Sequence, residues 1–393
     1  MSDERFDCII VGGGLAGLTA AYVLAGEGQE VLLVERGNYS GSKNMTGGRL
    51  YGHSLENVIA DFAVSAPVER KIVKERLSRG VGEDMSTVEY AGAGLACPPG
   101  ASYSVLRGKF DRWLADQAEE QGAILIYGVR VDSLLEKDGT VYGVVAGEDE
   151  MEADVVILAD GVNSLLAQKL GYKAPPLASQ VAVGAKEVIG LSEDIINERF
   201  GLAAGEGLAW MFCGGSGGQT YDAFLYTNKD SVSIGVAMLV EDIDKTENST
   251  PQMLEDFKNN PLIAPLIEGG RLMEYSAHLI PEGGEGMLPK LYGDGVLLAG
   301  DAAAFCANLG FTLRGMDLAV ESGRLAAQAV LAAKEKGDFS AETLSVYEQS
   351  LQETFVLACV KGGETCREAV KASKYEGDPL PALNAAMEKA GIR

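Results

Sequence analysis

The sequence feature that most constrains the fold is a glycine-rich turn within the first 36 residues. A short apolar run, Cys8-Ile9-Ile10-Val11, leads directly into Gly12-Gly13-Gly14-Leu15-Ala16-Gly17, which has the spacing Gly-x-Gly-x-x-Gly. In such a turn the first glycine permits a sharp bend, the second lets the backbone approach a pyrophosphate, and the third lets helix and strand pack closely. The pattern therefore predicts a strand, a tight turn and a helix from Leu15 to about Ala25, as in a dinucleotide-binding domain.

An acidic residue after the next apolar run supports this interpretation. Glu35 follows Val31-Leu32-Leu33-Val34, and a carboxylate there can accept hydrogen bonds from the ribose of an adenosine. The helix N-terminus would offer unpaired N–H groups and the positive end of the helix dipole to the phosphates. A glycine motif alone says little in a chain with 50 glycines, but the strand, the helix and the acid together make it specific.

Composition and charge narrow the class of protein. The chain has 393 residues, of which 47% are hydrophobic and 23% charged, as expected for a globular enzyme with more than one domain. A net charge of −24 argues against binding to nucleic acid and against electrostatic attraction to anionic lipid. The N-terminus lacks the apolar segment of a secretory signal, and no apolar run approaches the ~20 residues of a spanning helix. We expect a cytoplasmic protein that touches a membrane, if at all, through a local apolar patch.

The six cysteines do not form a metal-binding pattern. They stand at positions 8, 97, 213, 306, 359 and 366, without a Cys-x-x-Cys pair. This spacing argues against a zinc site and against a self-contained iron–sulfur cluster. We expect no metal site in the chain, and any cluster would belong to a partner.

The rest of the chain alternates between two kinds of pattern. An amphipathic helix over Phe110–Glu120 precedes short strand-like runs near Ile124, Val131 and Val141, and Asp138-Gly139 predicts a hairpin turn. A continuous apolar run, Val155–Ala159, is typical of a strand buried on both faces of a parallel sheet. Further strand-like runs predict a second, mainly antiparallel sheet; they are Val181–Val183, Trp210–Phe212, Ala223–Tyr226 and Ser231–Val240. Because strand pattern follows Gly214–Gly218, that cluster is interpreted as a loop and not as a second nucleotide site.

These patterns predict an α/β fold with interleaved domains. We expect a Rossmann-like dinucleotide-binding domain with a parallel sheet, built from residues 1–75, 105–175 and 285–335. A mainly antiparallel substrate domain would comprise residues 76–104 and 176–284. Residues 336–393 would form a C-terminal helical segment.

Two further strand ends carry acidic residues. Asp160-Gly161 follows the Val155 run directly, and Gly300-Asp301 follows the apolar run Val296–Ala299. An aspartate in such a position can be a helix N-cap. Taken with the glycine motif, Asp301 is interpreted instead as an acceptor for a hydroxyl group of a sugar-like chain.

In this order, the glycine motif with Glu35, Asp160-Gly161 and Gly300-Asp301 resemble the FAD-dependent oxidoreductases of the glutathione-reductase-like superfamily. The resemblance is to the branch with aromatic hydroxylases and geranylgeranyl reductases. Within that branch, the segment Lys43-Asn44-Met45-Thr46-Gly47-Gly48-Arg49-Leu50-Tyr51-Gly52-His53 closely resembles the FixC family, relatives of electron transfer flavoprotein–quinone oxidoreductase. Lys186–Gly190, Tyr226–Asp230 and Tyr275–His278 match the same family, and the likeness extends to about residue 350.

The resemblance implies FAD as the cofactor and assigns residues to it. The backbone of Gly12, Gly13, Gly14 and Gly17 would hold the pyrophosphate, and Glu35 the ribose. The other residues that the family pattern assigns to FAD are Arg36, Thr46, Gly47, Arg107, Val131, Asp160, Gly161, Gly300, Asp301, Arg314, Gly315 and Met316. Met316 also opens an alanine-rich pattern that runs to about Ala333. N–H groups at that helix start would stabilise the negative charge of a reduced flavin, although a purely structural helix start has similar residues.

Four side chains are candidates for the chemistry. Lys43 and Arg49 belong to the loop that would cover the flavin, and they bring positive charge towards it; an ordinary basic turn is the alternative. His53 and His278 are the two histidines of the chain. Either could supply a proton during quinone reduction, or could be a structural histidine.

The resemblance also implies a path for electrons. Electrons would arrive from the subunits of an electron transfer flavoprotein, pass through FAD, and leave towards a quinone within a FixABCX-like complex. A separate ferredoxin-like subunit would carry the iron–sulfur cluster, and the complex could contact the cytoplasmic membrane peripherally. Two alternatives are a geranylgeranyl reductase-like enzyme acting on a polyprenyl or other alkene, and a non-catalytic subunit that only holds flavin.

Substitutions of two predicted FAD ligands test this interpretation. Glu35→Ala removes the carboxylate expected at the ribose, and Asp301→Ala removes the acceptor expected at the sugar-like chain. Each variant should lose FAD during gel filtration, which the ratio of flavin absorbance to protein absorbance measures. Unchanged flavin occupancy in both variants would contradict the assignment.

Overall fold

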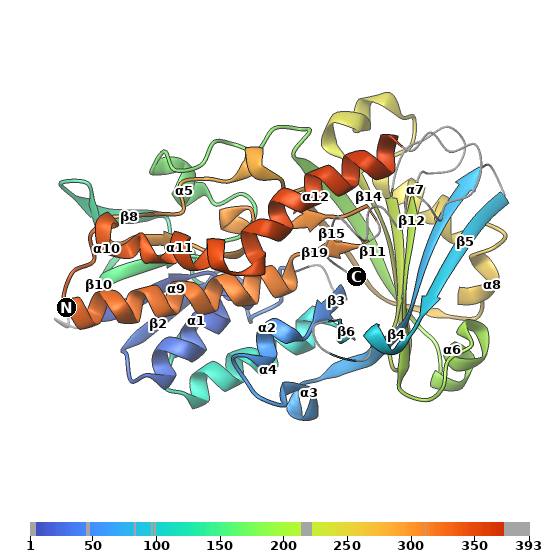
Figure 1. Ribbon diagram of the computed structural model, residues 1–393, viewed down its shortest axis with the longest axis horizontal. Helices are drawn as coiled ribbons and strands as arrows, with labels where there is room; N and C mark the ends of the chain where they lie inside the picture. The colour runs from blue at the N-terminus through green and yellow to red at the C-terminus, as the bar shows by residue number, and fades with distance from the viewer. Residues whose placement is uncertain are drawn as a thin grey trace.

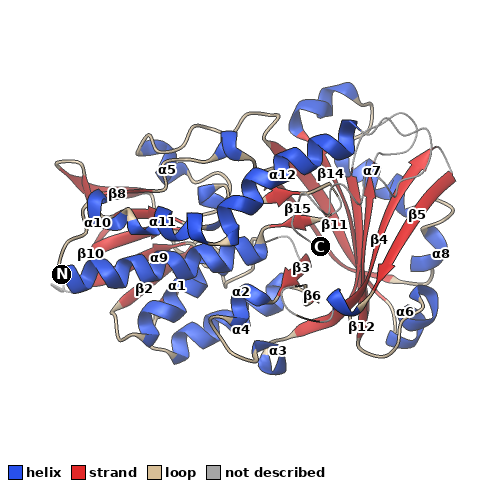
Figure 2. Ribbon diagram, viewed as in Figure 1, coloured by secondary structure: helices blue, strands red, loops and turns tan. Residues whose placement is uncertain are grey.

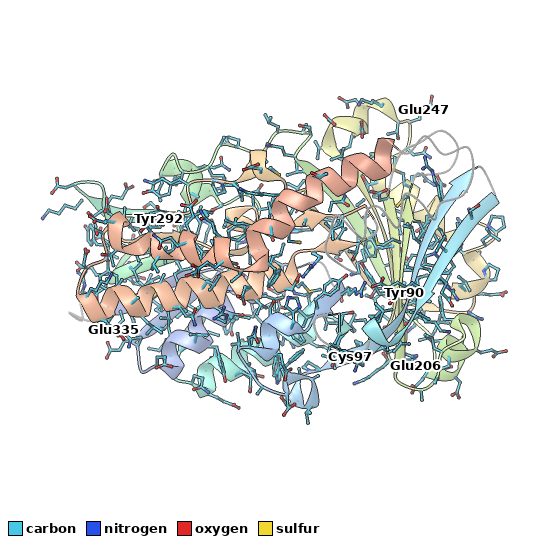
Figure 3. The ribbon with its side chains drawn as sticks, viewed as in Figure 1. Tyr90, Cys97, Glu206, Glu247, Tyr292 and Glu335 are labelled. Carbon is cyan, nitrogen blue, oxygen red and sulfur yellow. The ribbon has the colours of Figure 1, made fainter. Side chains whose placement is uncertain are left out.

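Two large sheets lie at opposite ends of an elongated molecule, with helices packed mainly around one of them (Figure 1 and Figure 2). The computed structural model describes residues 5–44, 48–81, 84–95, 97, 100–213, 222–310 and 312–372. Figure 3 shows Tyr292 and Glu335 at the end with the parallel sheet, and Tyr90 and Glu206 at the end with the antiparallel sheet. The chain passes between the two ends several times, as the fold class expected from the sequence requires.

The first sheet has eight strands and a parallel centre. Its spatial order is β16 (Tyr292–Gly293), β17 (Val296–Leu298), β10 (Asp149–Leu158), β1 (Phe6–Val11), β2 (Val31–Glu35) and β7 (Ile124–Tyr127), and β8 (Ser133–Lys137) and β9 (Thr140–Ala146) extend it from β10. The strands from β17 to β7 run parallel. The central residues of β17, β10, β1 and β2 are apolar and buried, as expected when helices cover both faces of a parallel sheet, whereas the edge strand β7 exposes Ile124 and Ile126.

The hairpin between β8 and β9 confirms the turn predicted at Asp138-Gly139. Asp138 has a φ of 52° and Gly139 a φ of 85°, and the two strands pair antiparallel on either side. Positive φ at both central residues is the geometry of a type I′ turn, whose twist matches that of the flanking strands.

The second sheet has nine strands and is mainly antiparallel. Its order is β15 (Arg271–Pro281), β11 (Val181–Gly190), β14 (Ser231–Leu239), β13 (Asp222–Thr227), β12 (Glu206–Cys213), β4 (Val68–Val81), β6 (Ser102–Val105) and β3 (Gly48–Tyr51), with β5 (Asp84–Ala91) on β4. The pair β12 and β4 is parallel. A short ribbon of β18 (Ala307–Asn308) and β19 (Leu313–Arg314) lies outside both sheets. Gly214–Gly218, which we expect to be a loop, lies outside the described residues.

Helices occupy the remaining ordered segments of the described chain. They are α1 (Leu15–Gly26), α2 (His53–Glu56), α3 (Phe62–Ser65), α4 (Arg107–Glu120), α5 (Leu165–Lys169), α6 (Glu193–Phe200), α7 (Thr250–Lys258), α8 (Ala264–Ile267), α9 (Met316–Lys336), α10 (Ala341–Leu344), α11 (Val346–Glu353) and α12 (Phe355–Ala372), with short 3-10 turns η1 (Ala93–Leu95), η2 (Val240–Lys245), η3 (Glu285–Met287) and η4 (Gly300–Ala303). α4 begins at Arg107, earlier than the predicted start at Phe110. The prediction began late because the first turn of the helix is polar and lacks apolar periodicity. None of these helices is long and apolar enough to cross a membrane.

Helices α1 and α9 approach each other unusually closely. A Cβ added at Gly323 of α9 would lie 2.2 Å from the carbonyl oxygen of Ala16 in α1. Gly300, at a φ of 63°, lies against the same helix, and a Cβ there would be 2.9 Å from the Cβ of Ala16. Small residues at these positions therefore let α1, α9 and the 3-10 turn η4 meet around one alanine.

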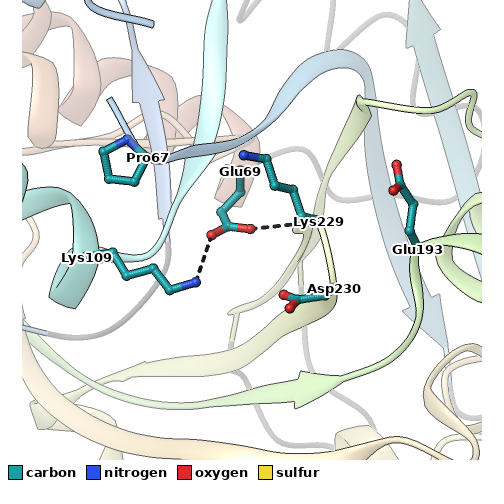
Figure 4. A pocket seen from close by; sticks show the side chains of 6 residues that line it. All are labelled: Pro67, Glu69, Lys109, Glu193, Lys229 and Asp230. Atoms are coloured by element: carbon teal, nitrogen blue, oxygen red, sulfur yellow. Dashed lines mark hydrogen bonds and ion pairs between the residues drawn. The ribbon is translucent and has the colours of Figure 1, made fainter. Parts of the chain in front are cut away.

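Arg70 links β4 to the turn between β13 and β14. Its side chain is fully buried, and its guanidinium donates hydrogen bonds to the Asn228 carbonyl (2.6 Å), the Asn197 amide oxygen (2.6 Å) and the Glu206 carbonyl (2.9 Å). The neighbouring Glu69 accepts from the Lys229 amide at 3.0 Å and lies 3.6 Å from the Lys109 ammonium (Figure 4). Glu69 and Arg70 therefore connect strand β4 to the β13–β14 turn and to α4.

Arg70 should therefore be a main determinant of stability. Arg70→Met leaves several buried acceptors without a donor, and we expect the free energy of unfolding to fall by about 3 kcal/mol, measured by urea denaturation. Arg5→Met is the control. Arg5 is half exposed and pairs with Glu152 and Asp154, so its loss should cost less than about 1 kcal/mol. Equal losses of unfolding free energy in the two variants would show that the buried hydrogen bonds of Arg70 stabilise the fold no more than an exposed ion pair does.

Candidate functional site

A cavity of about 610 Å³ lies where the parallel strands end and the second sheet begins. Its walls come from the β1–α1 turn, the ends of β2 and β10, the turn η4, the start of α9, and strands β13 and β15 of the antiparallel sheet. Ligands of open α/β sheets bind at the carboxyl ends of the strands, where these loops gather. The cavity is therefore the candidate functional site.

The glycine motif takes up three different roles at the edge of this cavity. Gly12 has a φ of 110°, and a Cβ there would lie 2.3 Å from the Ala159 carbonyl oxygen. A Cβ at Gly17 would lie 2.1 Å from the Gly12 carbonyl oxygen, so this glycine permits the close packing of helix and turn. Gly14 lines the cavity, and no atom of the described residues lies within 4 Å of a Cβ added to it. The open space at Gly14 would leave room for the pyrophosphate that the glycine motif predicts.

Glu35 is held in place by two backbone amides. One carboxylate oxygen accepts from the Gly13 amide at 2.7 Å and the other from the Gly37 amide at 2.5 Å. The side chain lines the cavity beside the glycine motif. The strand end, the turn and the carboxylate therefore form one unit, in the arrangement expected for binding the adenosine side of a dinucleotide.

Two long helices begin at the cavity without a side-chain cap. Gly14 is the N-cap of α1 and Gly315 the N-cap of α9, and neither helix start has a capping hydrogen bond from a side chain. Gly14, Gly315 and Met316 all line the cavity. The first N–H groups of both helices are thus available to an anionic ligand, and both dipoles favour negative charge there.

Asp301 lies among positive groups at the centre of the site. Burial raises the pKa of its carboxyl group, and the positive charges of Arg107, His278 and Lys173 oppose this effect. The Lys173 ammonium donates to the carbonyls of Val162 (2.8 Å) and Ala302 (3.0 Å), so it ties the loop after β10 to the turn that carries Asp301. Burial lowers the pKa of Lys173 and also that of His278.

Arg107 is fixed by a buried carboxylate. Its guanidinium donates to the two oxygens of Asp111 at 2.7 and 2.9 Å, one helical turn later in α4. Asn44 donates to the same carboxylate at 2.6 Å, and a Cβ at Gly41 would lie 2.8 Å from the Arg107 carbonyl. Asp111 therefore holds both Arg107 and the loop that contains Lys43 against the cavity.

Two arginines of another wall contact the same aromatic ring. The Arg49 guanidinium lies 4.4 Å and the Arg314 guanidinium 4.7 Å from the centre of the Tyr51 ring. Arg49 also pairs with Glu75, and Arg314 pairs with Asp317, so both charges are partly neutralised. Burial lowers the pKa of both guanidinium groups, but Tyr51 and Glu75 around Arg49, and Asp317 beside Arg314, raise each pKa above its usual value. Both arginines stay charged at the edge of the cavity.

Most of the residues assigned from sequence meet at this cavity. Those that line it are Gly12, Gly14, Glu35, Arg36, Lys43, Arg49, Arg107, Val131, Asp160, Gly161, His278, Gly300, Asp301, Arg314, Gly315 and Met316. Gly13 and Gly17 lie behind the turn, where they support its shape. Thr46 and Gly47 lie outside the described residues. The role of each side chain towards FAD stays a prediction.

His53 lies apart from the cavity wall. Its ring contacts Phe355 of α12, with ring centres 4.7 Å apart. Burial lowers the pKa of His53, and among the described residues its Nδ1 has no hydrogen-bond partner. Of the two candidate histidines, His278 is therefore the one that faces the cavity directly.

The sequence analysis missed several residues of the site. Lys173 and Ser322 organise η4, since the Ser322 hydroxyl accepts from the Gly300 amide at 3.0 Å. Neither belongs to a recognisable motif. Phe224 and Tyr226 line the cavity from β13 with ring centres 5.4 Å apart. Tyr226 could have been suspected, because it begins one of the segments that match the family.

The charge of the cavity is opposite to that of the chain. Seven of its lining residues are basic and four acidic; they are Arg36, Lys43, Arg49, Arg107, Arg130, Lys169 and Arg314, and Glu35, Asp132, Asp160 and Asp301. The whole chain has a net charge of −24. A basic cavity with two uncapped helix starts and an open glycine cradle fits the diphosphate of FAD.

Comparison with known proteins gives relatives over most of the chain. The family model described as "FAD binding domain" matches residues 5–355. The chain is 53% identical over 358 residues to "Probable electron transfer flavoprotein-quinone oxidoreductase YdiS" of Escherichia coli K12, which covers 91% of this chain and 83% of that protein. It is also 53% identical over 353 residues to "Protein FixC" of the same organism, which covers 90% of this chain and 82% of the relative.

A solved structure shares the fold at lower identity. It is a geranylgeranyl bacteriochlorophyll reductase-like protein from Thermoplasma acidophilum, with a TM-score of 0.74 and 21% sequence identity. The match covers 98% of this chain and 96% of that chain. This likeness shows the fold alone, which joins a parallel dinucleotide-binding sheet to a large antiparallel sheet.

The open space at Gly14 generates a test that separates binding from folding. Gly14 is extended, with a φ of −89° and a ψ of −177°, and so tolerates a side chain. We expect Gly14→Val to leave the urea midpoint of the FAD-free protein nearly unchanged. It should weaken FAD binding at least about tenfold, because the side chain blocks the charge-assisted hydrogen bonds of the pyrophosphate.

A matched control comes from α12. A Cβ added to Gly362 would also have no atom of the described chain within 4 Å, but Gly362 does not line the cavity. Gly362→Val should therefore bind FAD like the wild type in a fluorescence titration. Full FAD affinity in Gly14→Val would contradict the proposed cradle.

Proposed function

Because the chain belongs to the FixC family of FAD-dependent oxidoreductases, we propose that it accepts electrons from an electron transfer flavoprotein and passes them through FAD to a quinone. The observation that carries this proposal is the 53% identity, over about nine tenths of the chain, to relatives named FixC and electron transfer flavoprotein-quinone oxidoreductase. The matched region covers about nine tenths of the chain, far more than the glycine motif alone.

The residues around the cavity suit this role. FAD, when bound, supplies the chemistry of electron transfer, and the protein supplies position and electric field. Gly14 and Glu35 would hold the adenosine diphosphate part, while Asp301 and the start of α9 would hold the ribityl and ring. Lys43 and Arg49 would favour negative charge at the far end of the cavity.

The acceptor side of the cavity would be formed by the antiparallel sheet. Phe224 and Tyr226 offer aromatic surface on which a quinone ring can pack. Reduction of a quinone to a quinol takes up two electrons and two protons. His278 faces this region and is our candidate to deliver a proton.

A quinone dissolved in lipid would need a route to this cavity. Strand β15 forms an edge of the antiparallel sheet, and its residues from His278 to Pro281 line the cavity. The outer part of the same strand exposes Leu272, Met273 and Tyr275, each about half accessible to solvent. We therefore propose that the outer part of β15 is the peripheral contact with the membrane.

The partners in this proposal are separate chains. An iron–sulfur cluster would belong to a ferredoxin-like subunit, as the family resemblance implies. Among the described residues no group of three or more His, Cys, Asp or Glu side chains could hold a metal ion. The electron transfer flavoprotein would complete a FixABCX-like complex.

Anaerobic stopped-flow absorbance tests the direction of this path. The FAD-loaded protein is mixed with reduced electron transfer flavoprotein and, separately, with NADH and with NADPH. We expect fast bleaching of the flavin only with the flavoprotein, followed by reoxidation when a short-chain ubiquinone is added.

Other outcomes would replace the proposal. Fast bleaching by a nicotinamide would indicate a stand-alone reductase or hydroxylase. Reoxidation by a polyprenyl alkene and not by quinone would indicate an enzyme of the geranylgeranyl reductase type. Slow reaction with every donor and acceptor would indicate a subunit that only holds flavin.

A further inference from the structure

A lysine is buried without a hydrogen-bond partner beside the acceptor side of the cavity. Lys186 lies in the middle of β11 and is 1% exposed. Its Nζ has no hydrogen-bond partner among the described residues. Lysines are almost never fully buried unless they are paired, because removal of an ammonium from water is costly. A ligand oxygen would supply the acceptor that the protein does not.

The sheet register directs this lysine towards the cavity wall. Lys186 is opposite Gly235 of β14, and Gly235 is in turn opposite Phe224 of β13. Because Gly235 has no side chain, the Phe224 ring covers it, and a Cβ there would lie 2.4 Å from the ring. The Lys186 ammonium lies 5.4 Å from the centre of that ring. Phe224 itself lines the cavity.

A second wall residue lies on the other side of the lysine. His278 of β15 is opposite Gly184 of β11, two residues before Lys186, so the two positions share a face of the sheet. Lys186 therefore stands between two wall residues, Phe224 and His278. Lys186 does not itself line the cavity among the described residues; it is buried behind this wall, next to the region that the proposed function assigns to the quinone.

Burial and the charged groups around Lys186 bring the pKa of its amine close to neutral pH. Burial lowers its pKa to about 7, Glu274 of β15 opposes this effect, and Arg107 of α4 adds to it. The neighbouring Glu187 points to the opposite face of the sheet, where it pairs with Lys258 and not with Lys186. The ammonium form is thus present below about pH 7 and is lost as the pH rises through that value.

We propose that Lys186 is the hydrogen-bond donor that binds a carbonyl oxygen of the quinone on the antiparallel-sheet side of the cavity. This inference rests on the proposed function, since a quinone is the acceptor. A quinone ring packed on Phe224 brings its carbonyl next to the lysine, whose four-carbon stem lets the ammonium reach it. The donor also stabilises the negative charge that develops on that oxygen during reduction.

Stability gives the first test and does not depend on activity. Lys186→Met keeps the length of the side chain and removes a buried amine without a partner. We expect the Tm to rise by about 3 °C, because the wild type carries the cost of burying the amine. The rise should be larger at pH 6 than at pH 9. Between the folded pKa of about 7 and the ordinary value of 10.5, the unfolded chain binds more protons, so wild-type stability increases with pH.

Quinone binding gives the second test. A short-chain ubiquinone is titrated into the oxidised FAD-loaded protein, and its Kd is read from the change in flavin absorbance. At pH 6 the Kd of Lys186→Met should be about tenfold higher than that of the wild type, and at pH 9 the two should converge. Lys186→Arg, which stays charged, should retain binding and lose the pH dependence.

The control removes a lysine from the opposite face of the same sheet. Lys258 pairs with Glu187, which neighbours Lys186 in β11. Lys258→Met should leave the Kd for ubiquinone and its pH dependence unchanged. Reduction of the flavin by the electron transfer flavoprotein should also proceed at the wild-type rate in Lys258→Met.

The outcomes separate this inference from the proposed function. If the wild type binds ubiquinone and Lys186→Met binds it equally well at pH 6, the role of Lys186 is wrong and the proposed function stands. A fall in Tm for Lys186→Met would also overturn the inference, since the lysine would then be structural. If the wild type neither binds nor reduces ubiquinone, the proposed function fails, and the inference fails with it.

Discussion

The close approach of helices α1 and α9 is the constraint on which the functional site depends. Gly323 touches the backbone of Ala16, and Gly300 packs on the side chain of the same alanine. This contact brings together two uncapped helix N-termini and the turn that carries Asp301. A larger residue at any of these positions would separate α1 from η4 and α9, which lie near the other end of the sequence. The anion-binding character of the site is therefore a consequence of packing between small residues.

Charge is distributed in the opposite sense inside and outside the molecule. The chain is strongly acidic, yet basic side chains predominate around the cavity. Buried carboxylates keep those basic groups in place, as Asp111 does for Arg107 and Asp317 for Arg314. Lys173 has the opposite role: its buried ammonium donates hydrogen bonds to the carbonyls of Val162 and Ala302 and so positions the backbone next to the acidic Asp301. The electrostatic field at the site is thus fixed before any ligand arrives, as electron transfer to a bound cofactor requires.

The antiparallel sheet contributes more than a wall. Its edge strand β15 runs from an exposed apolar stretch into the cavity, and the next strand, β11, carries the buried Lys186. The rung from Lys186 through Gly235 to Phe224 joins a charged group to an aromatic surface. Membership of the FixC family accounts for the FAD side of the cavity. The wall formed by the antiparallel sheet is the place where proteins with the same fold can differ in the electron acceptor they bind. Side chains on a strand face can be exchanged without a change in the backbone.

The sequence by itself determined the α/β class, the beginning of the dinucleotide-binding domain, the hairpin at Asp138 and the residues of the glycine motif, because these follow from local periodicity and backbone conformation. Family resemblance added residues such as Arg107 and Arg314, which reach the same cavity. Only the tertiary structure decided that His278 faces the cavity while His53 packs on Phe355, and that buried Lys186 has no hydrogen-bond partner within the described part of the chain. Neighbours across a sheet or between helices are set by register and packing over long sequence separations, and no local pattern encodes them.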